Sequence, residues 1–437
     1  MEGMEEGQGA ANIYDLWQEK EGYTPDGPFL ILSGGDNWTG PAISTWTQGK
    51  SMVEVMNAMN YDASAVGNHE FDFGLDELKT RIAEAQFPYL SANTRWKADG
   101  RIPLDLGILP YTFKTVNDLK VGIIGLTTQG TSTAANPAYV SVFNFVDYEP
   151  ALRETLPEVA AEDPDIVLVI SHVCVPELER LIRNTQDLNI TMMGAGHCNE
   201  LVARRIGNTV LLGGGFHFSS YASIDIEFDL ANDRVTRTRF DTHEYIHEGK
   251  DPEIASIVDS WATEMEQELS VEVAYLDRSL ERRSDALSQL IIDSWLVADD
   301  SADVAITNLG GIRADLEAGP VNVGDVVAVL PFDNTIVAVE MTGEELLIAL
   351  EQGERAAVAG LERRGRTNYV TSRGAPLEDN ETYRVLVNSF MYAGGSGWTI
   401  FAEVDPDAYD TGINYHQPFQ DWLQQQNSSA EQPLQLD

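Results

Sequence analysis

The chain has 437 residues, a length that is too great for one ordinary core and predicts two domains. Of these residues, 43% are hydrophobic. Its 70 acidic residues against 28 Lys and Arg give a formal net charge of −42, which excludes a protein that binds nucleic acid polymers through their like-charged phosphates. No apolar run approaches the ~20 residues of a membrane helix, which excludes a bilayer-spanning protein.

The first two-thirds of the chain alternates short apolar runs with amphipathic stretches, a pattern that predicts an α/β domain. Strands are predicted, in chain order, at Phe29–Leu32, Ala63–Val66, Val121–Leu126, Ile166–Ile170, Ile190–Met193 and Val210–Leu212. Helices are predicted at Ser51–Met59, Leu75–Ala85 and Pro176–Asn184. From Ser223 onward, strict alternation of apolar and polar residues predicts a strand with one solvated face.

The stretch from Asp251 to Leu269 begins with Asp-Pro, is rich in acids, and is predicted to be a helix that connects the domains. Beyond it the pattern predicts a helix, a strand, a helix and a strand, at Asp285–Val297, Asp303–Thr307, 342–350 and Tyr383–Val387. Thr342 and Glu345 have the spacing of a capping box. The predicted organisation is therefore a domain over 1–247, a linker helix over 248–272 and a domain over 273–437, with a fraying tail after Trp422.

Polar side chains follow four predicted strands of the first domain at the points where the strands end. They are Asp36, Asn68 with His69, His172 and His197. In open α/β sheets, ligands gather beyond the carboxyl ends of the strands. Carboxylate, amide and imidazole groups together suit Zn²⁺, Mn²⁺ or Fe²⁺ better than Ca²⁺. A lone histidine at a strand end is more often a structural residue, and Gly-Asp pairs are common in turns, but the joint pattern predicts a metal centre.

These strand ends resemble four signature blocks of the calcineurin-like metallophosphoesterases, in the form found in the 5′-nucleotidase family. The matching segments are Gly34-Gly35-Asp36 through Gly40, Gly67-Asn68-His69-Glu70-Phe71-Asp72, Ser171-His172, and Gly196-His197-Cys198-Asn199. The resemblance implies a four-layer α/β/β/α metallophosphoesterase domain, followed by a smaller α+β nucleotide-binding domain.

On the matched positions, the resemblance implies two divalent metal ions (Zn, Mn, Mg or Fe). Asp36 would bridge the two ions, Asn199 would contribute to one, and Asn68, His172 and His197 would complete the other. Two ions ~3.5–4 Å apart can hold a hydroxide for in-line attack on a phosphoryl group. His69, oriented by Asp72, would be catalytic and would stabilise phosphoryl charge or protonate the leaving oxygen.

The chain departs from the family at the first block, an Asp-x-His motif that supplies the remaining metal ligands. Upstream of Asp36 there is Asp15 but no histidine, and Met1–Lys20 resembles the helix that normally follows the block. Two interpretations remain open: a gene start placed too late, which removes the first strand, or a single-metal or inactive variant. The family resemblance implies an extracytoplasmic location, although the first residues have no signal-peptide pattern.

The resemblance continues in three loops of the second domain: Asn308–Arg313, Leu330–Asn334 and Phe390–Trp398. It implies that Arg283 and Arg313 bind a nucleotide phosphate, for which their forked donors are suited, and that Asn308 hydrogen-bonds the ligand. Phe332 and Phe390 would stack on the two faces of the base. By themselves, the two Phe residues are more typical of core packing.

Ser396 stands where the family usually carries an Asp for the ribose hydroxyls, and Trp398 takes an aromatic position in the same loop. Serine keeps hydrogen bonding without the strength of a carboxylate. The expected substrates are therefore nucleoside 5′-monophosphates or related phosphate esters, such as nucleotide sugars or cyclic nucleotides. The alternative is a nucleotide- or metal-binding homologue impaired in catalysis. The resemblance further implies a hinge near Asp251–Asp277 that carries substrate to the metals.

The two cysteines exclude a disulfide-rich scaffold. Cys174 and Cys198 lie near candidate ligands and are expected to be small packing residues rather than ligands. Acidic residues are spread along the whole chain, so a disordered tail does not explain the charge. The charge favours a halophilic protein, because molar salt shortens the Debye length to ~3 Å; an ordinary acidic protein is the alternative.

Overall fold

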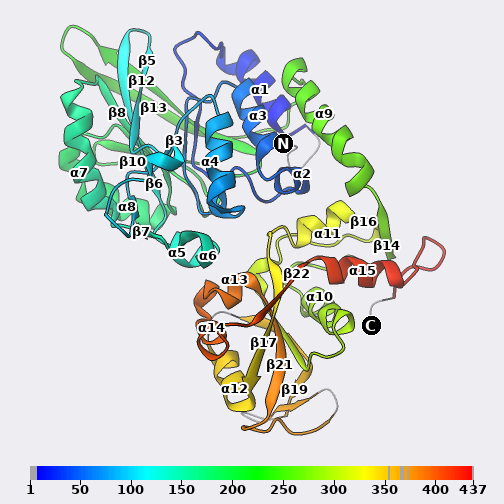
Figure 1. The fold of residues 1–437 in the computed structure, drawn as a ribbon. Coiled ribbons are helices and arrows are strands. Elements are labelled where there is room, and N and C mark those ends of the chain that lie inside the picture. Colours follow the sequence, from blue (N-terminus) through cyan, green and yellow to red (C-terminus); the bar gives the residue numbers. More distant parts are fainter. Residues whose placement is uncertain (1–6, 353–354, 365–368, 372–373, 436–437) are drawn as a thin grey trace. The chain divides into compact units, whose positions relative to one another are not determined.

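The computed structural model describes residues 7–352, 355–364, 369–371 and 374–435, which fold into two compact units (Figure 1). The first unit contains the chain up to Trp38, Thr47–Ser132 and Tyr139–Trp261; the second contains Thr39–Trp46, Thr133–Ala138 and the chain from Ala262. Of the helix predicted within Met1–Lys20, residues 1–6 lie outside the described residues. The remainder forms α1 (Ala10–Leu16) and the π-helix η1 (Trp17–Glu21).

The main sheet of the first unit has six strands in the order β10-β11-β9-β8-β6-β5. Four of them are parallel: β6 (Leu119–Thr127), β8 (Ile166–His172), β9 (Met192–Ala195) and β11 (Thr209–Gly214). The antiparallel strands β5 (Tyr111–Val116) and β10 (Leu201–Ile206) close the two edges. Because β8 and β9 are parallel neighbours, the loops that follow them begin at the same edge of the sheet.

The smaller sheet of the first unit has three parallel strands, β1 (Leu32–Ser33), β2 (Ala63–Ala65) and β3 (Tyr89–Leu90). The strand predicted at Phe29–Leu32 is displaced, since pairing with β2 begins only at Leu32. Before that point the Ile31 N–H donates to the Asp62 carboxylate at 2.9 Å, not to a neighbouring strand. The Asp62 carboxylate is thus the partner of the Ile31 N–H, while the Ile31 carbonyl accepts from Asp62 N at 2.8 Å.

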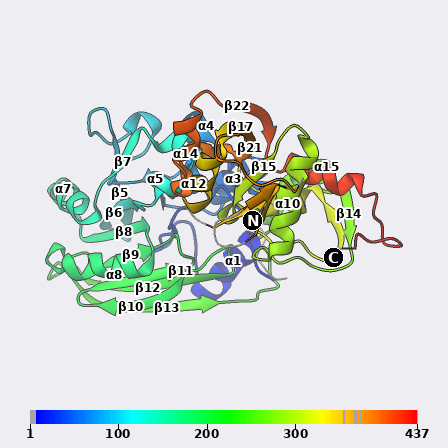
Figure 2. The same ribbon diagram turned by 90° about the horizontal axis from the view of Figure 1, so that it is seen from below.

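Apolar side chains of both sheets share one core, to which the hairpin β12 (Ser220–Asp229) and β13 (Arg234–Glu244) adds its inner face. Ile224, Ile226 and Phe228 pack against this core while Asp225 and Glu227 are exposed, which confirms the predicted alternation. Figure 2 shows the hairpin beside β10 and β11.

Helices complete the layers on both sides of the first unit. The helices α7 (Tyr148–Ala161) and α8 (Val175–Asn184) bury Leu152, Leu178 and Ile182 against the six-stranded sheet. The helices α3 (Lys50–Ala58) and α4 (Gly74–Glu84) connect the strands of the smaller sheet. The result is the predicted α/β/β/α arrangement. Its short elements are α5 (Thr131–Ala134), α6 (Pro137–Val140), β4 (Thr94–Trp96), β7 (Phe143–Phe145), η2 (His69–Phe71), η3 (Leu104–Leu106) and η4 (Gln186–Leu188).

The second unit is built on a mixed five-stranded sheet of order β18-β15-β21-β17-β22. One face is covered by α10 (Asp285–Ala298) and α15 (Gln417–Gln425), and the other by α12 (Gly343–Glu351), α13 (Ser389–Tyr392) and α14 (Ile400–Val404). The strands are β15 (Val304–Asn308), β17 (Thr335–Thr342), β18 (Ala356–Ala359), β21 (Thr382–Asn388) and β22 (Tyr409–Asn414). The smaller elements are α2 (Ala42–Trp46), α11 (Val323–Val329), η5 (Leu309–Gly311), η6 (Gly395–Gly397), β14 (Glu272–Leu276), β16 (Gly319–Asn322), β19 (Leu361–Arg363) and β20 (Tyr369–Thr371). This is the α+β domain that was expected.

Helix α9 (Pro252–Leu269) occupies the stretch predicted as a connector, and the boundary between the two units falls within it. The tail does not fray as expected, because Leu434 N donates to Tyr275 O of β14 at 2.7 Å. Across the described residues, no helix combines the length and apolarity that crossing a membrane requires.

Candidate functional site

The loops that follow β1 and β2 approach each other so closely that two glycines are required. A Cβ on Gly35, whose φ is +90°, would lie 2.8 Å from the Gly67 nitrogen. A Cβ on Gly67 would lie 2.1 Å from Asp36 Oδ1. The glycines thus let the loops that carry Asp36 and Asn68 lie against each other.

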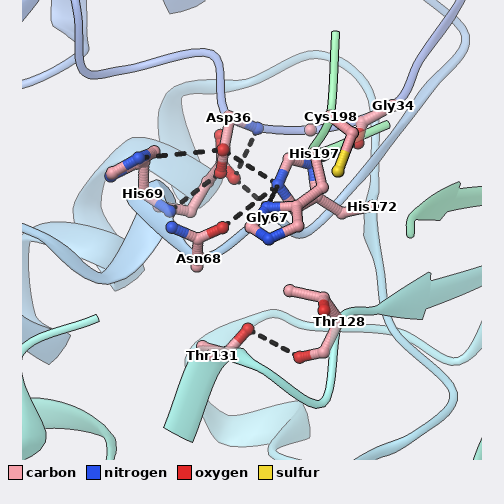
Figure 3. Close-up of polar contacts among 12 residues, drawn as sticks. Gly34, Asp36, Gly67, Asn68, His69, Thr128, Thr131, His172, His197 and Cys198 are labelled. Carbon is pink, nitrogen blue, oxygen red and sulfur yellow. Dashed lines mark hydrogen bonds and ion pairs between the residues drawn. The ribbon is translucent and has the colours of Figure 1, made fainter. Parts of the chain in front are cut away.

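Three predicted metal ligands, Asp36, Asn68 and His197, lie around Nε2 of the fourth, His172 (Figure 3). This nitrogen lies 2.8 Å from Asp36 Oδ2, 3.1 Å from Asn68 Oδ1 and 3.1 Å from His197 Nδ1. The ligand atoms of Asp36, His172 and His197 all lie within 4.8 Å of one another. The structure therefore brings together side chains from four strand ends, as the sequence pattern had predicted.

The chemistry of these atoms fits a cation. His172 Nδ1 lies 2.8 Å from the Gly34 carbonyl oxygen, which can only accept, so Nδ1 carries a proton, and in the neutral ring it carries the only one. Its Nε2 lone pair then faces a carboxylate oxygen and an amide oxygen, neither of which has a proton to give. A metal-bound histidine typically donates its other N–H to a backbone carbonyl in this way. A shared cation would satisfy all of these lone pairs at once.

The electrostatics of the cluster point the same way. Burial raises the pKa of Asp36, but His172 and His69 outweigh burial and hold that pKa below its ordinary value. Burial lowers the pKa of His172, yet Asp36 and then Glu70 outweigh it and leave the pKa raised. The pKa of His197 is lowered by burial and by His172. The space between Asp36 and His172 therefore attracts positive charge.

His69 lies beside this cluster and is oriented by Asp72. Because η2 is a short 3₁₀-helix, side chains three residues apart share a face, and His69 Nδ1 lies 2.7 Å from Asp72 Oδ2. His69 Nε2 lies 3.9 Å from Asp36 Oδ2 and so faces the cluster of candidate ligands. The predicted pairing of these two residues is present in the structure.

Asn199, predicted as a ligand of a second cation, lies two residues beyond His197 in the same loop. It is exposed and has a left-handed backbone with φ +59°. Its role as a ligand stays a prediction.

Glu70, for which the sequence predicted no role, has a fully buried carboxylate. The carboxylate accepts three backbone hydrogen bonds, from Gly67 N at 2.6 Å, Asn37 N at 2.7 Å and Asp36 N at 2.9 Å. Burial and the neighbouring Asp36 raise its pKa to about 7. Only its place in the motif marked Glu70 in the sequence, because its bonds to Asp36 N and Asn37 N reach another loop, which no local pattern shows.

The prediction that the two cysteines are packing residues was wrong. Cys174 and Cys198 form a disulfide with a Cα–Cα distance of 5.2 Å, and Cys198 is exposed. The loops after β8 and β9 run side by side, and this brings the two residues within bridging reach.

In the second unit, sheet topology gathers the three predicted substrate-binding loops. The carboxyl ends of β15 and β21 and the beginning of β17 lie at the same edge of the sheet. Asn388 Nδ2 donates to Asn308 Oδ1 at 2.9 Å and joins the first loop to the third. Thr335 N donates to Ser389 Oγ at 3.1 Å and joins the second loop to the third.

The predicted substrate-binding residues take different positions on these loops. The Arg313 guanidinium lies over the Phe332 ring, 5.8 Å from its centroid. The Phe390 ring packs on Gly395, where a Cβ would lie 2.4 Å from it, and Ser396 follows with φ +50°. Arg283 is exposed just before α10.

Two residues in or beside these loops differ from the sequence predictions, Trp398 in its role and Arg355 in not having been predicted. Trp398 is buried and donates its indole N–H to Ala349 O at 3.1 Å, so it is a core residue of this unit. Arg355 was not predicted; its carbonyl accepts from Leu309 N at 3.2 Å, which places a further arginine beside Asn308. The segment around Arg355 gave no sequence signal of its own.

Comparisons with known proteins agree with this architecture. The sequence profile of the family described as "5'-nucleotidase, C-terminal domain" matches residues 266–403. The 5'-nucleotidase of Vibrio cholerae is 26% identical, over 91% of this chain and 82% of that protein. The crystal structure of a 5'-nucleotidase precursor from Thermus thermophilus is 25% identical and superposes with a TM-score of 0.80, over 97% of this chain and 92% of that one.

A third relative is the trifunctional nucleotide phosphoesterase protein YfkN of Bacillus subtilis, 27% identical over 86% of this chain. The alignment spans only 30% of the YfkN protein. The solved calcineurin-like phosphoesterase of YfkN covers 60% of this chain and 90% of its own with a TM-score of 0.53, at 21% identity. The chain is therefore similar to 5'-nucleotidases along most of its length, its residues 266–403 match that family's C-terminal domain, and it shares the fold of a calcineurin-like phosphoesterase.

Proposed function

We propose that this protein hydrolyses nucleoside 5′-monophosphates or related phosphate esters, such as nucleotide sugars and cyclic nucleotides. The observation that carries the proposal is the convergence of Asp36, Asn68 and His197 on His172 Nε2. The names of the relatives, 5'-nucleotidase and trifunctional nucleotide phosphoesterase, support nucleotides as the substrate class.

Calcineurin-like phosphoesterases use divalent metal ions, and we propose that this chain holds two of them. Bound there, such ions would polarise the phosphoryl oxygens and lower the pKa of water at the site. Asp36, the anionic member, would lie between the two ions, with Asn68, His172 and His197 on one side and Asn199 on the other. The Gly34 carbonyl keeps the His172 lone pair directed into the centre.

His69 is the proton donor or charge stabiliser in this proposal. Its Nδ1 is held by Asp72, so the opposite nitrogen is the one presented toward the centre. A side chain in that position can protonate the leaving ester oxygen.

We assign the recognition of the nucleotide to the loop cluster of the second unit. Arg283 and Arg313 would bind phosphate and oppose the repulsion that a chain of net charge −42 exerts on an anionic substrate. Phe332 and Phe390 would stack on the base, Asn308 would hydrogen-bond it, and Ser396 would bind the ribose.

A nucleotide- or metal-binding homologue without turnover is the second candidate. The observation that favours it is that Asp36, Asn68 and His197 converge on His172 whereas Asn199, the candidate ligand of the other ion, is exposed.

Phosphate release from AMP in the presence of Mn²⁺ or Zn²⁺ distinguishes the two candidate functions. The enzyme releases phosphate, and Asp36→Asn lowers turnover by about 100-fold or more because an anionic ligand is lost, while adenosine binding is retained. Asp99→Asn, in an exposed loop, is the matched control and keeps full turnover. AMP binding without phosphate release would favour the second candidate, and full activity of Asp36→Asn would exclude the role given to Asp36.

A further inference from the structure

We infer that the Cys174–Cys198 disulfide is a positioning element of the candidate metal centre. It holds the loop that carries His197 and Asn199 against the loop after His172, and its reduction weakens cation binding. This inference rests on the metal centre proposed above, and extends it with a dependence on redox state.

The bridge lies immediately beyond two of the candidate ligands. Cys198 directly follows His197, and Cys174 lies two residues after His172. The bridge therefore joins the two chain segments immediately beyond the parallel strands β8 and β9. Figure 3 shows Cys198 close to His197 and the other candidate ligands. A covalent link at this point acts on the ligand loops more directly than on the sheet behind them.

The backbone of the bridged loop is left-handed on both sides of Cys198. His197 and Asn199, on either side of Cys198, both have left-handed backbones, with φ of +68° and +59°. Residues with a Cβ rarely adopt this conformation, and surrounding structure has to hold them there. Both are candidate ligands, so a relaxation of this loop would displace donor atoms from the centre.

Two further bonds attach the loop on either side of the bridge. Gly196 N donates to Val173 O at 3.1 Å, and Val175 N donates to the Glu200 carboxylate at 2.9 Å. These bonds fix the two ends of the segment 196–200. In its middle, the His197 ring contacts His172, Cys198 N donates within the segment to Gly196 O at 2.8 Å, and the disulfide is the covalent link to the loop after β8. We therefore expect the loop to stay near its place after reduction, with His197 and Asn199 less well ordered.

The exposure of Cys198 makes the bridge accessible to a reductant. The pairing of β8 with β9 does not depend on the disulfide. Reduction should consequently lower the affinity for a divalent cation more than it lowers the stability of the fold. A disulfide that only stabilised the fold would change the melting temperature and leave cation affinity unaltered.

The test compares Mn²⁺ affinity, measured by isothermal titration calorimetry, in three samples: oxidised protein, protein reduced with a phosphine, and the double variant Cys174→Ser, Cys198→Ser. The reduced protein and the double variant should bind Mn²⁺ about 10-fold or more weakly than the oxidised protein, as when an outer-shell partner of a ligand is lost. The phosphine should have no effect on the double variant, which is the matched control. Saturating Mn²⁺ should restore phosphate release in the double variant.

Equal Mn²⁺ affinity in the oxidised and reduced protein would overturn the positioning role and leave the proposed function intact. Failure of the oxidised protein to bind Mn²⁺ would instead overturn the metal centre, and the inference with it. Circular dichroism of the reduced wild-type protein is to check that it is folded. The comparison of oxidised with reduced protein then tests the inference even if the double variant does not fold.

Discussion

At the scale of single residues, Glu70 joins the two loops that carry Asp36 and Asn68. Its buried carboxylate accepts from the backbone of Asp36, Asn37 and Gly67. In Glu70→Gln, one of these accepting oxygens becomes an NH₂ group that faces an N–H donor. We expect a loss of about 1–3 kcal/mol in the free energy of unfolding, because a buried donor is left unsatisfied. Cation affinity should fall about 10- to 100-fold, since the ligand loops lose their support.

Urea unfolding and Mn²⁺ titration measure these two effects of Glu70→Gln. The matched control is Glu244→Gln, an exposed residue at the end of β13, which should change neither quantity measurably. Unaltered Mn²⁺ affinity in Glu70→Gln would contradict a supporting role for this carboxylate.

His416 gives a prediction for the pH dependence of stability. It precedes α15, and burial lowers its pKa from 6.5 to about 4. The unfolded chain therefore takes up a proton near pH 6.5, whereas the folded protein does not until about pH 4. The contribution of His416 to the free energy of unfolding is therefore fully present above pH 6.5 and is lost as the pH falls toward 4. We expect a loss of about 2 kcal/mol, which is less than the full pKa shift corresponds to, because the ring keeps some solvent contact.

Urea unfolding of wild type and His416→Gln between pH 7 and pH 4 measures that contribution. The difference in unfolding free energy, wild type minus variant, should decrease as the pH falls. Two curves that stay parallel over this range would show that His416 has an ordinary pKa in the folded protein.

The ligands of the candidate site were predictable because their positions depend only on where strands end. Apolar runs mark β1, β2, β8 and β9, and parallel strands deliver the following residues to one edge. The supporting interactions were not predictable in the same way. Glu70 acts through backbone groups of another loop, and the disulfide depends on the distance between two residues 24 positions apart. Both need the register of the strands, which no local pattern contains.

At the scale of elements, two helices of the second unit begin with a complete capping box. At α12, Glu345 N donates to the Thr342 hydroxyl at 3.3 Å and Thr342 N donates to the Glu345 carboxylate at 2.8 Å. The same arrangement at α11 uses Asn322 and Asp325. The first box was predicted from Thr-Gly-Glu-Glu; the second follows a strand too short to be recognised in the sequence.

The substitution Thr342→Ala should cost about 1 kcal/mol of unfolding free energy, because the amide of Glu345 loses its partner at the start of α12. Urea unfolding monitored by circular dichroism measures the change. Thr382→Ala, an exposed threonine at the beginning of β21, is the control and should stay within ~0.5 kcal/mol of wild type. A loss no larger than that of the control would mean that the cap does not stabilise α12.

The elements that sequence patterns recovered are those buried on both faces, such as β6, β8 and β15. Several of the elements that were missed lie at sheet edges, although the interior strand β17 was missed as well. Strand β10 reads Leu-Val-Ala-Arg-Arg-Ile and is largely solvent-accessible, so its hydrophobic signal is weak. Such strands form because a neighbour supplies their hydrogen bonds, and that neighbour is remote in the sequence.

At the scale of the whole molecule, the surface is dominated by negative charge. Even if all 28 Lys and Arg were paired one to one with acids, 42 of the 70 acidic residues would remain unpaired. In the described part of the chain, Glu70 and Asp72 are the only buried acidic residues. The excess charge therefore lies where solvent ions can reach it.

We accordingly predict that stability increases steeply with salt, as in a halophilic protein. Self-repulsion favours the expanded, unfolded chain, and raising KCl from 0.1 M to molar concentrations shortens the Debye length from ~10 Å to ~3 Å and screens that repulsion. Thermal unfolding at pH 7 over a KCl series measures the effect, with sucrose as the uncharged control. The gain should shrink toward the isoelectric point of about 4.3, where the repulsion itself disappears. Equal melting temperatures at low and molar KCl would show that the charge is an ordinary surface property of this protein.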